Sequence, residues 1–432
     1  MKTSHGIAAR AAAIELLEDV LTNKLALDVA LEQSKLFKVL EGSDRSFARL
    51  IASATLRRLG EIDTVLDGLL HKPIANNAMP VLHTLRAGVA QLMFLETPPH
   101  AAVDTAVAYL KNSRYAGFSG LANAILRRAS SIPAMHSESA ARTNTPVWLY
   151  ESWVRSFGEN SALAIASAHS EEAPLDISVK QDPRRTADAL DGQILPTGSV
   201  RLPSTRDIKN LPGFDPGDWW IQDAAAALPA KLIPQPTGKR VIDLCAAPGG
   251  KSAQLAVRGA NVTAVDHSSE RLDLFRQNFK RLHLSAKTIQ LDAEKWRPKE
   301  LADAVLLDAP CSATGTIRRH PDLPYLKDKS DVRRLAKYQS RLLKAAAEMV
   351  RPGGHLIYAV CSLQPEEGLR IVNKFLIANK QFVREPIDEC DPEFPKEFCT
   401  KNGDLQTLPC HWPELGGIDG FFAARLVRLE AS

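Results

Sequence analysis

The first 130 residues repeat apolar side chains at the three- and four-residue spacing of amphipathic helices. Glycines and prolines, among them Gly60, Pro80 and Pro98, separate the repeats. Seven helices are expected, over residues 8–21, 25–37, 44–58, 62–70, 81–95, 101–111 and 120–129. The pattern therefore predicts an all-α domain over residues 1–135.

The pattern becomes irregular in the next 90 residues. A polar stretch ends at Pro146, helical spacing returns over residues 146–170, and short apolar runs at 177–179 and 199–202 predict strands. Residues 136–222 are therefore expected to form a small α+β linking domain that helps to hold RNA. Near its end, Trp219 and Trp220 could stack on a base, although paired tryptophans more often pack between domains.

Strand and helix patterns alternate from residue 240 onward. Apolar runs near 241, 262, 288, 304 and 355 predict strands, and amphipathic stretches near 252, 270, 335 and 366 predict helices. This alternation is typical of a parallel sheet covered on both faces. Residues 223–432 are thus expected to form a Rossmann-like α/β domain, with an antiparallel strand over 421–428.

The first strand of this domain runs into a tight turn and a helix, in the sequence RVIDLCAAPGGKS at residues 240–252. Glycines in the turn let the backbone approach a ligand, and the helix amides face it, so a nucleotide-like ligand is expected. The dinucleotide fingerprint is absent. A phosphate-binding loop of an ATPase remains an alternative, although Cys245 stands at its first glycine and Pro248 lacks an amide.

Two acidic residues follow the next two strands of the predicted sheet. Asp266 ends the run NVTAVD, and Asp292 comes after residues 288–291. The carboxyl ends of parallel strands form the ligand-binding edge, where Asp266 could accept hydrogen bonds from ribose hydroxyls. Alternatively, each carboxylate caps the helix that follows.

Composition narrows the class of protein. The chain has 432 residues and 45% apolar residues, which suits several globular domains. Its six cysteines form no C-x-x-C pair, so we expect neither a metal site nor disulfides. Without a membrane-length apolar run or a secretory signal, a cytoplasmic protein is expected.

Charge is informative only locally. The net charge of +4 is too small to indicate nucleic-acid binding. Between residues 314 and 344, however, nine lysines and arginines stand against three aspartates. This run predicts a surface for a polyphosphate substrate, with a solvated basic helix as the alternative.

Three motifs together resemble the RNA cytosine-5 methyltransferases. They are VIDLCAAPGGKS at 241–252, DAPCSATGTIRRHPD at 308–322 and CSLQPEEG at 361–368, in that family's order. The resemblance implies S-adenosylmethionine as the cofactor. The residues that it implies for cofactor binding are Cys245, Ala246, Ala247, Pro248, Gly249, Gly250, Lys251, Asp266, Asp292 and Asp308.

The resemblance also implies the catalytic residues. Cys361 would be the nucleophile that adds to carbon 6 of cytosine, Cys311 would assist product release, and Asp308 would contact the cytosine ring or the cofactor. Carbon 5 is a poor nucleophile, and thiolate addition makes it enamine-like. On general grounds a lone Cys361 would instead be a buried structural thiol. Val360 and Gly368 stand where the family commonly has threonine and asparagine, which affects only neighbouring details.

The N-terminal segment resembles the RNA-binding helical domain of NusB-type antitermination factors. The resemblance is carried by Arg45, Phe47 and Ala48, Leu85 and Arg86, Gln91 and Leu92, Pro98 to His100, and the run NAILRR at 123–128. Together with the catalytic motifs it implies a methyltransferase of small-subunit (16S) ribosomal RNA, which we expect to act as a monomer. Transfer RNA as the substrate, or a non-catalytic RNA-binding assembly factor, are the alternatives.

Overall fold

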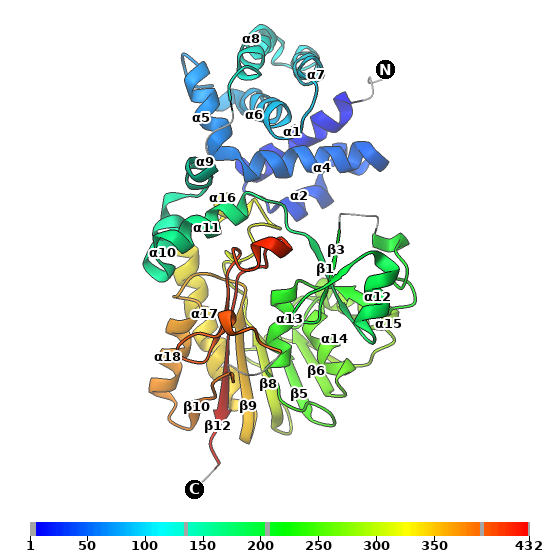
Figure 1. Cartoon of the computed structure of the whole chain (residues 1–432), viewed down its shortest axis with the longest axis vertical. Coiled ribbons are helices and arrows are strands. Elements are labelled where there is room, and N and C mark those ends of the chain that lie inside the picture. Colours follow the sequence, from blue (N-terminus) through cyan, green and yellow to red (C-terminus); the bar gives the residue numbers. More distant parts are fainter. Residues whose placement is uncertain (1–5, 134–136, 204–207, 389–392, 431–432) are drawn as a thin grey trace. The chain divides into compact units, whose positions relative to one another are not determined.

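The computed structural model describes residues 6–133, 137–203, 208–388 and 393–430. The chain forms two compact units (Figure 1): Met1–Glu172 with Ile317–Asp328, and Ala173–Thr316 with Lys329–Ser432. The predicted linking segment, 136–222, is therefore divided: its first three helices, up to His169, belong to the first unit, and its strands and the helix Pro183–Leu190 belong to the second. In the described part of the chain, no helix has both the length and the apolar character needed to cross a membrane.

The first unit is helical, as its apolar spacing predicts. Its main elements are α1 (Ile7–Leu21), α2 (Leu27–Gln33), α3 (Lys35–Lys38), α4 (Gly42–Arg57), α5 (Leu59–Leu69), α6 (Met79–Met93), α7 (Pro99–Lys111), α8 (Ser119–Ala129), α9 (Ser137–Asn144), α10 (Val147–Phe157) and α11 (Glu159–His169). The helix expected over 25–37 is divided at Ser34, whose hydroxyl accepts a hydrogen bond from Phe37 N and caps α3.

The prediction that Gly60 separates two helices is wrong. Gly60 lies in the first turn of α5. A Cβ atom at this position would lie 2.1 Å from the carbonyl oxygen of Thr143, which belongs to α9. The glycine therefore permits close backbone packing rather than ending a helix.

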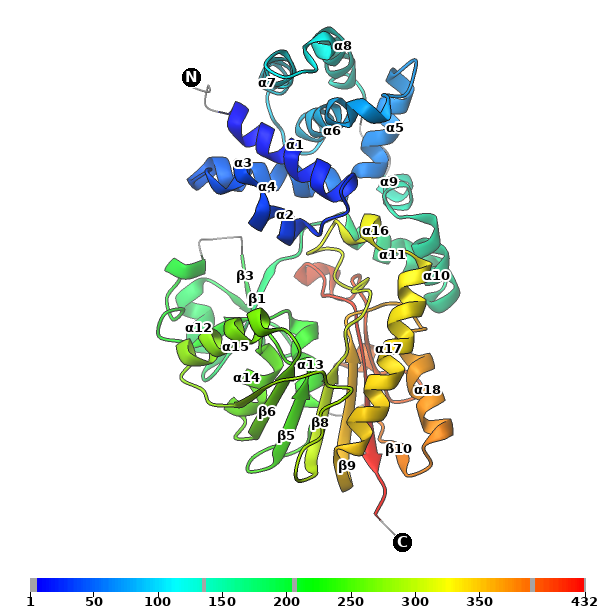
Figure 2. The ribbon, with the colours of Figure 1, turned by 180° about the vertical axis from the view of Figure 1, so that it is seen from behind.

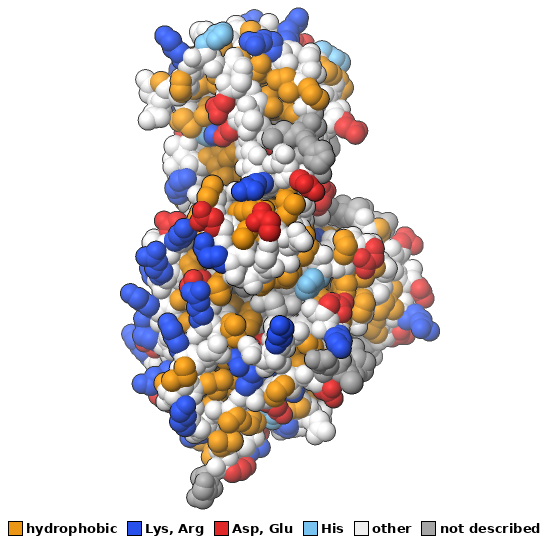
Figure 3. All heavy atoms as spheres, turned by 60° about the vertical axis from the view of Figure 1, so that its left-hand side comes forward, with side chains coloured by type: hydrophobic (Ala, Val, Ile, Leu, Met, Phe, Trp, Pro, Cys, Tyr) orange, Lys and Arg blue, Asp and Glu red, His pale blue; other side chains and the backbone are white. Residues whose placement is uncertain are grey.

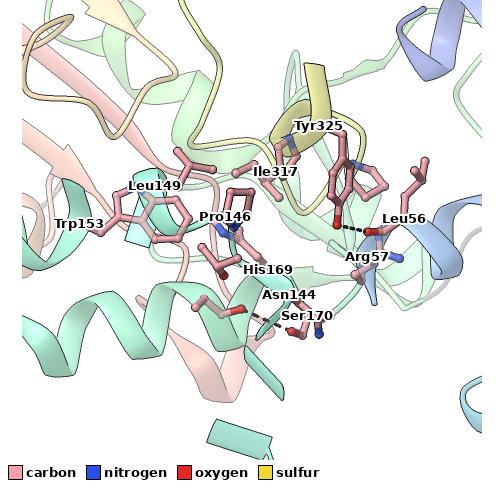
Figure 4. A pocket seen from close by; sticks show the side chains of 14 residues that line it. Leu56, Arg57, Asn144, Pro146, Leu149, Trp153, His169, Ser170, Ile317 and Tyr325 are labelled. Atoms are coloured by element: carbon pink, nitrogen blue, oxygen red, sulfur yellow. Dashed lines mark hydrogen bonds between the residues drawn. The ribbon is translucent and has the colours of Figure 1, made fainter. Parts of the chain in front are cut away.

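The segment Ile317–Asp328, which contains α16 (Leu323–Leu326), packs into the first unit although both of its flanks belong to the second. Figure 4 shows Tyr325 beside Leu56, where the phenol donates a hydrogen bond of 2.9 Å to the Leu56 carbonyl oxygen. Asp322 accepts a hydrogen bond of 2.9 Å from Leu27 N. It thereby caps α2, whose own N-cap residue has no polar side chain.

The second unit contains a small antiparallel sheet. Strand β1 (Leu175–Val179) pairs with β3 (Val200–Leu202) and β4 (Trp219–Ile221), β2 (Gln193–Ile194) pairs with β3, and α12 (Pro183–Leu190) follows β1. Trp219 is fully buried, and Trp220 is 5% exposed. Both indoles pack inside this unit, Trp219 in the core of the small sheet and Trp220 in the cluster that contains Phe275, rather than between the two units.

A larger sheet has the strand order β10-β12-β9-β8-β5-β6-β7. Its parallel strands are β5 (Arg240–Leu244), β6 (Asn261–Asp266), β7 (Lys287–Gln290), β8 (Ala302–Asp308) and β9 (Val350–Val360). Strand β12 (Phe421–Arg428) pairs antiparallel with β9 and with β10 (Phe382–Arg384), and β11 (Leu405–Thr407) pairs with β12. The predicted parallel sheet and its late antiparallel strand are confirmed.

Helices cover both faces of this sheet (Figures 1 and 2). The first face carries α13 (Ala224–Lys231), α14 (Gly250–Val257) and α15 (Ser269–Arg281), and the other carries α17 (Lys329–Glu348) and α18 (Leu369–Ala378). Side chains of β5 alternate between the faces, since Val241 packs with Leu228 and Ile242 packs with Leu342. Because β8 lies between β5 and β9, the carboxyl ends of these three strands are neighbours.

Candidate active site

The loop between β5 and α14 adopts left-handed backbone conformations at both of its ends. The φ angle is 59° at Cys245 and 107° at Gly249. A Cβ atom on Gly249 would lie 2.7 Å from the ring of Phe275, so a glycine is required there. The loop borders a cavity of about 500 Å³, a size that suits a nucleotide-like ligand. The predicted residues that line it are Ala246, Ala247, Pro248, Gly249, Gly250, Lys251 and Asp308.

Asp243 also lines this cavity, although the sequence interpretation missed it. Its Oδ2 accepts a hydrogen bond of 2.5 Å from Ser252 Oγ, and its Oδ1 has no partner among the described residues. Burial raises the pKa of Asp243 to about 7. A cationic ligand would satisfy this carboxylate, so the cavity fits the ammonium and sulfonium groups of S-adenosylmethionine. An acid between Ile242 and Leu244, inside an apolar strand, was the available signal.

Lys251 and Asp308 form an ion pair at the same edge of the sheet. The Lys251 Nζ and Asp308 Oδ2 atoms are 2.7 Å apart. Burial alone lowers the pKa of Lys251, but the Asp308 carboxylate reverses this effect, and the pKa is raised overall. The ammonium also lies 4.9 Å from the centre of the Phe421 ring. Lys251 is therefore held charged, and it fixes the orientation of Asp308.

Three predicted cofactor residues do not line the cavity. Asp266 is buried, and its carboxylate accepts hydrogen bonds from the backbone amides of Ala247 and Ser268, at 3.2 and 3.0 Å. Asp292 accepts a hydrogen bond of 2.9 Å from Glu294 N. Cys245 packs against the apolar core, and burial raises the pKa of its thiol. Asp266 thus holds the loop in place, and direct cofactor contacts by these three residues stay predictions.

The structure brings the two predicted catalytic thiols together. Cys311 follows the end of β8 and Cys361 follows the end of β9, and these strands are parallel neighbours. Their Sγ atoms are 3.4 Å apart. The hydrogen bond to Cys361, together with burial, raises the pKa of Cys311 well above its usual value. The raised pKa favours the protonated form of Cys311, and either sulfur could be the donor in the contact between the two thiols.

The basic run predicted over 314–344 is divided between the two units. Arg318 is 2% exposed and belongs to the segment that packs into the first unit. The lysines and arginines of α17 belong to the second unit and are exposed. Within this run, α17 carries the exposed basic side chains, and the expectation of a surface for a polyphosphate substrate stays a prediction. Among the described residues, no three His, Cys, Asp or Glu side chains gather as a metal site would require.

Comparison with known proteins gives consistent matches over the whole chain. Residues 230–427 match the family of the 16S rRNA methyltransferase RsmB/F, and residues 7–131 match the NusB family. Ribosomal RNA small subunit methyltransferase B of Pseudomonas putida is 33% identical, over 98% of this chain and 99% of the relative. The corresponding protein of Cronobacter sakazakii is 30% identical, over 97% and 98%.

A solved structure supports the fold of the second unit. NSun6 from Pyrococcus horikoshii, in its structure with SFG, aligns with a TM-score of 0.56 at 20% identity, over 66% of this chain and 99% of that one. The identity to the bacterial relatives over nearly full length establishes the family. The chain therefore belongs to the ribosomal RNA small subunit methyltransferase B family of S-adenosylmethionine-dependent enzymes, and it joins a NusB-family helical domain to an RsmB/F methyltransferase domain.

Proposed function

We propose that this enzyme methylates carbon 5 of a cytosine in small-subunit (16S) ribosomal RNA, through a covalent bond between Cys361 Sγ and carbon 6. The observation that carries the proposal is the separation of 3.4 Å between the Cys311 and Cys361 sulfurs, at the carboxyl ends of adjacent strands. Two thiols at one sheet edge suit a reaction in which one thiol attacks a ring and the other assists its departure. We place the enzyme in the cytoplasm, acting as a monomer.

The proposed reaction begins when the Cys361 thiolate adds to carbon 6 and makes carbon 5 electron-rich. When bound, S-adenosylmethionine supplies the methyl group that carbon 5 takes up. Loss of the carbon 5 proton to a base then restores the ring double bond and expels Cys361 as a thiolate. Cys311, which keeps its proton, donates a hydrogen bond to the departing sulfur and so stabilises it.

Asp308 is the proposed contact for the cytosine ring or for the cofactor's amino group. Its carboxylate lines the cavity and is oriented by the ion pair with Lys251. Its position at the end of β8, three residues before Cys311, brings a hydrogen-bond acceptor to the edge that carries the thiols. The cofactor contacts expected from Cys245, Asp266 and Asp292 also belong to this proposal.

The exposed face of α17 is the proposed track for the RNA backbone. Four basic residues on this face follow one another by three or four positions, which places them along one side of the helix: Arg334, Lys337, Arg341 and Lys344; Arg333 adjoins the first of them. Figure 3 shows lysine and arginine side chains gathered along one edge of the visible face. Among the described residues, no carboxylate forms an ion pair with Arg333, Lys337 or Lys344. Arg334 and Arg341 pair with Asp331 and Glu294, and the three cations without such a pair suit successive phosphates.

The test incubates the wild type, Cys361→Ala and Cys311→Ala with labelled S-adenosylmethionine and undermodified small-subunit RNA. We expect Cys361→Ala to abolish transfer, and Cys311→Ala to accumulate a protein–RNA adduct that survives a denaturing gel. Cys410→Ala, outside the site, serves as the matched control. Methylation by both site variants would overturn the proposal. Faster methylation of transfer RNA than of small-subunit RNA would indicate that transfer RNA is the substrate. Cofactor binding without transfer to any RNA would indicate a non-catalytic factor.

A further inference from the structure

A buried carboxylate lies between the two loops that carry the thiols. Glu367 is fully buried, in the turn that precedes α18. Its Oε1 accepts hydrogen bonds from Ser312 N at 2.9 Å and from Gln339 Nε2 at 3.0 Å. Its Oε2 accepts one of 2.5 Å from Ser362 Oγ and another from Ser312 Oγ. The carboxylate thus accepts four hydrogen bonds, which is more than the stabilisation of a single turn would require.

The donors identify what this carboxylate connects. Ser312 directly follows Cys311, and Ser362 directly follows Cys361. The two hydroxyls are also 3.1 Å apart and share Oε2 as their acceptor. Gln339 adds a third link, because its amide also donates to the Pro310 carbonyl oxygen, on the other side of Cys311. Glu367 therefore fixes the loops after β8 and β9 to each other and to α17.

We propose that Glu367 is a positioning residue that holds the sulfurs of Cys311 and Cys361 at their working separation. This inference rests on the proposed function. The Glu367 carboxylate accepts its hydrogen bonds from the serines that follow the two cysteines, so it acts on the thiols through these serines. A displacement of about 1 Å in a reacting group can reduce a rate by about a hundredfold, so a shared anchor for both loops has a direct catalytic consequence.

The charge of Glu367 has a second measurable effect. Burial raises the pKa of Glu367, and its four hydrogen-bond donors oppose this by stabilising the carboxylate. The negative charge in turn contributes to the raised pKa of Cys311, after the hydrogen bond to Cys361 and burial. Replacing the carboxylate by an amide should therefore make the Cys311 thiol more acidic, an effect that a purely structural residue would not produce.

The experiment compares Glu367→Gln with Glu366→Gln in the full chain. Glu366 is the matched control, because its carboxylate is partly exposed and pairs with Arg370 at 2.8 Å. For Glu367→Gln we expect kcat of RNA methylation to fall about tenfold to a hundredfold, with KM for S-adenosylmethionine changed by less than about twofold. Alkylation of Cys311 by iodoacetamide, followed by mass spectrometry, should shift its pH–rate profile to lower pH.

A second variant separates geometry from charge and guards against misfolding. Ser312→Ala with Ser362→Ala removes both hydroxyl links but keeps the carboxylate, so kcat should fall while the Cys311 alkylation profile stays near that of the wild type. If Glu367→Gln matches Glu366→Gln in both measurements, the inference is wrong. The alkylation needs no RNA, so it still tests Glu367 if the methylated atom proves to be another.

Discussion

Cys311 Sγ lies 3.4 Å from Cys361 Sγ. The two sulfurs come from the ends of adjacent parallel strands, so the sheet itself fixes their separation. A disulfide has a sulfur–sulfur bond of about 2.05 Å. Only a small displacement of the two loops therefore separates the pair from a covalent bond.

We predict that diamide converts this pair into a disulfide in the absence of RNA. The two thiols lose two protons and two electrons, and the azo group of diamide takes them up to become a hydrazine. Peptide mapping without reduction should find the Cys311–Cys361 link, with methylation lost and then restored by dithiothreitol. Equal cross-linking of Cys311 or Cys361 to any other cysteine would contradict the geometry.

The affinity for S-adenosylmethionine should depend on pH through Asp243. The pKa of this buried carboxyl is raised to about 7, so it is protonated below neutrality and charged above it. A cationic ligand binds the charged form more tightly, and each pH unit below 7 should weaken binding by up to about tenfold. Calorimetry at pH 5.5, 6.5 and 8 measures the effect.

Asp243→Asn keeps an oxygen for the Ser252 hydroxyl but removes the titration. Its affinity should be lower than that of the wild type at pH 8 and should change little with pH. A wild-type affinity that is constant from pH 5.5 to 8 would show that Asp243 does not face the cationic part of the ligand.

Removing basic residues from α17 should weaken RNA binding and should also make the affinity for RNA less dependent on the salt concentration. In the triple variant Arg333→Gln, Lys337→Gln and Lys344→Gln, three phosphate contacts would be lost. The slope of log K against log salt should then fall by about 2, at about 0.7 per contact with single-stranded RNA. Binding measured from 50 to 300 mM salt tests this.

The control removes the same charge from other exposed positions of the second unit, Lys280, Lys287 and Lys299. This variant should keep the slope of the wild type. An equal loss in both variants would mean that the enzyme responds to net charge and has no defined track.

The helical unit should lose stability in mild acid because of His83. Its side chain is fully buried, and burial, with a smaller effect of Arg86, lowers its pKa to about 3. Below pH 6.5 the unfolded chain binds a proton at this histidine that the folded chain excludes. The contribution of neutral His83 to the free energy of unfolding is therefore fully present above pH 6.5 and is lost as the pH decreases. Between pH 6.5 and 5 this residue should cost about 2 kcal/mol.

Thermal unfolding at both pH values, in His83→Gln and in the exposed His71→Gln, measures this contribution. The loss of stability between pH 6.5 and pH 5 should be smaller in His83→Gln than in the wild type, and in His71→Gln it should equal that of the wild type. The same loss in all three proteins would assign the acid sensitivity to other groups.

Local sequence patterns correctly predicted the helices and the strand ends, because these features depend mainly on residues that are close together in the sequence. Helical spacing located the bundle, and the ends of apolar runs placed Asp308, Cys311 and Cys361 at one edge of the sheet. Gly60 was misread because its role depends on the Thr143 carbonyl, which no local pattern reports.

Long-range contacts account for the other omissions. Glu366 and Glu367 look equivalent in the motif CSLQPEEG, and only the fold buries Glu367 and leaves Glu366 partly exposed. Asp243 was passed over as part of an apolar strand, although its burial beside a cavity gives it a ligand-binding position. In both cases the chemistry comes from the surroundings that tertiary structure supplies.

The packing of Ile317–Asp328 into the first unit means that no single cut in the chain separates the two units. A fragment that begins at Ala173 would keep the whole sheet but would leave Tyr325 and Leu326 without the helices that cover them. The same deletion would remove the acceptor of the Tyr325 hydroxyl. Dissection of this enzyme into working halves therefore requires either co-expression of both pieces or a redesigned loop at this crossing.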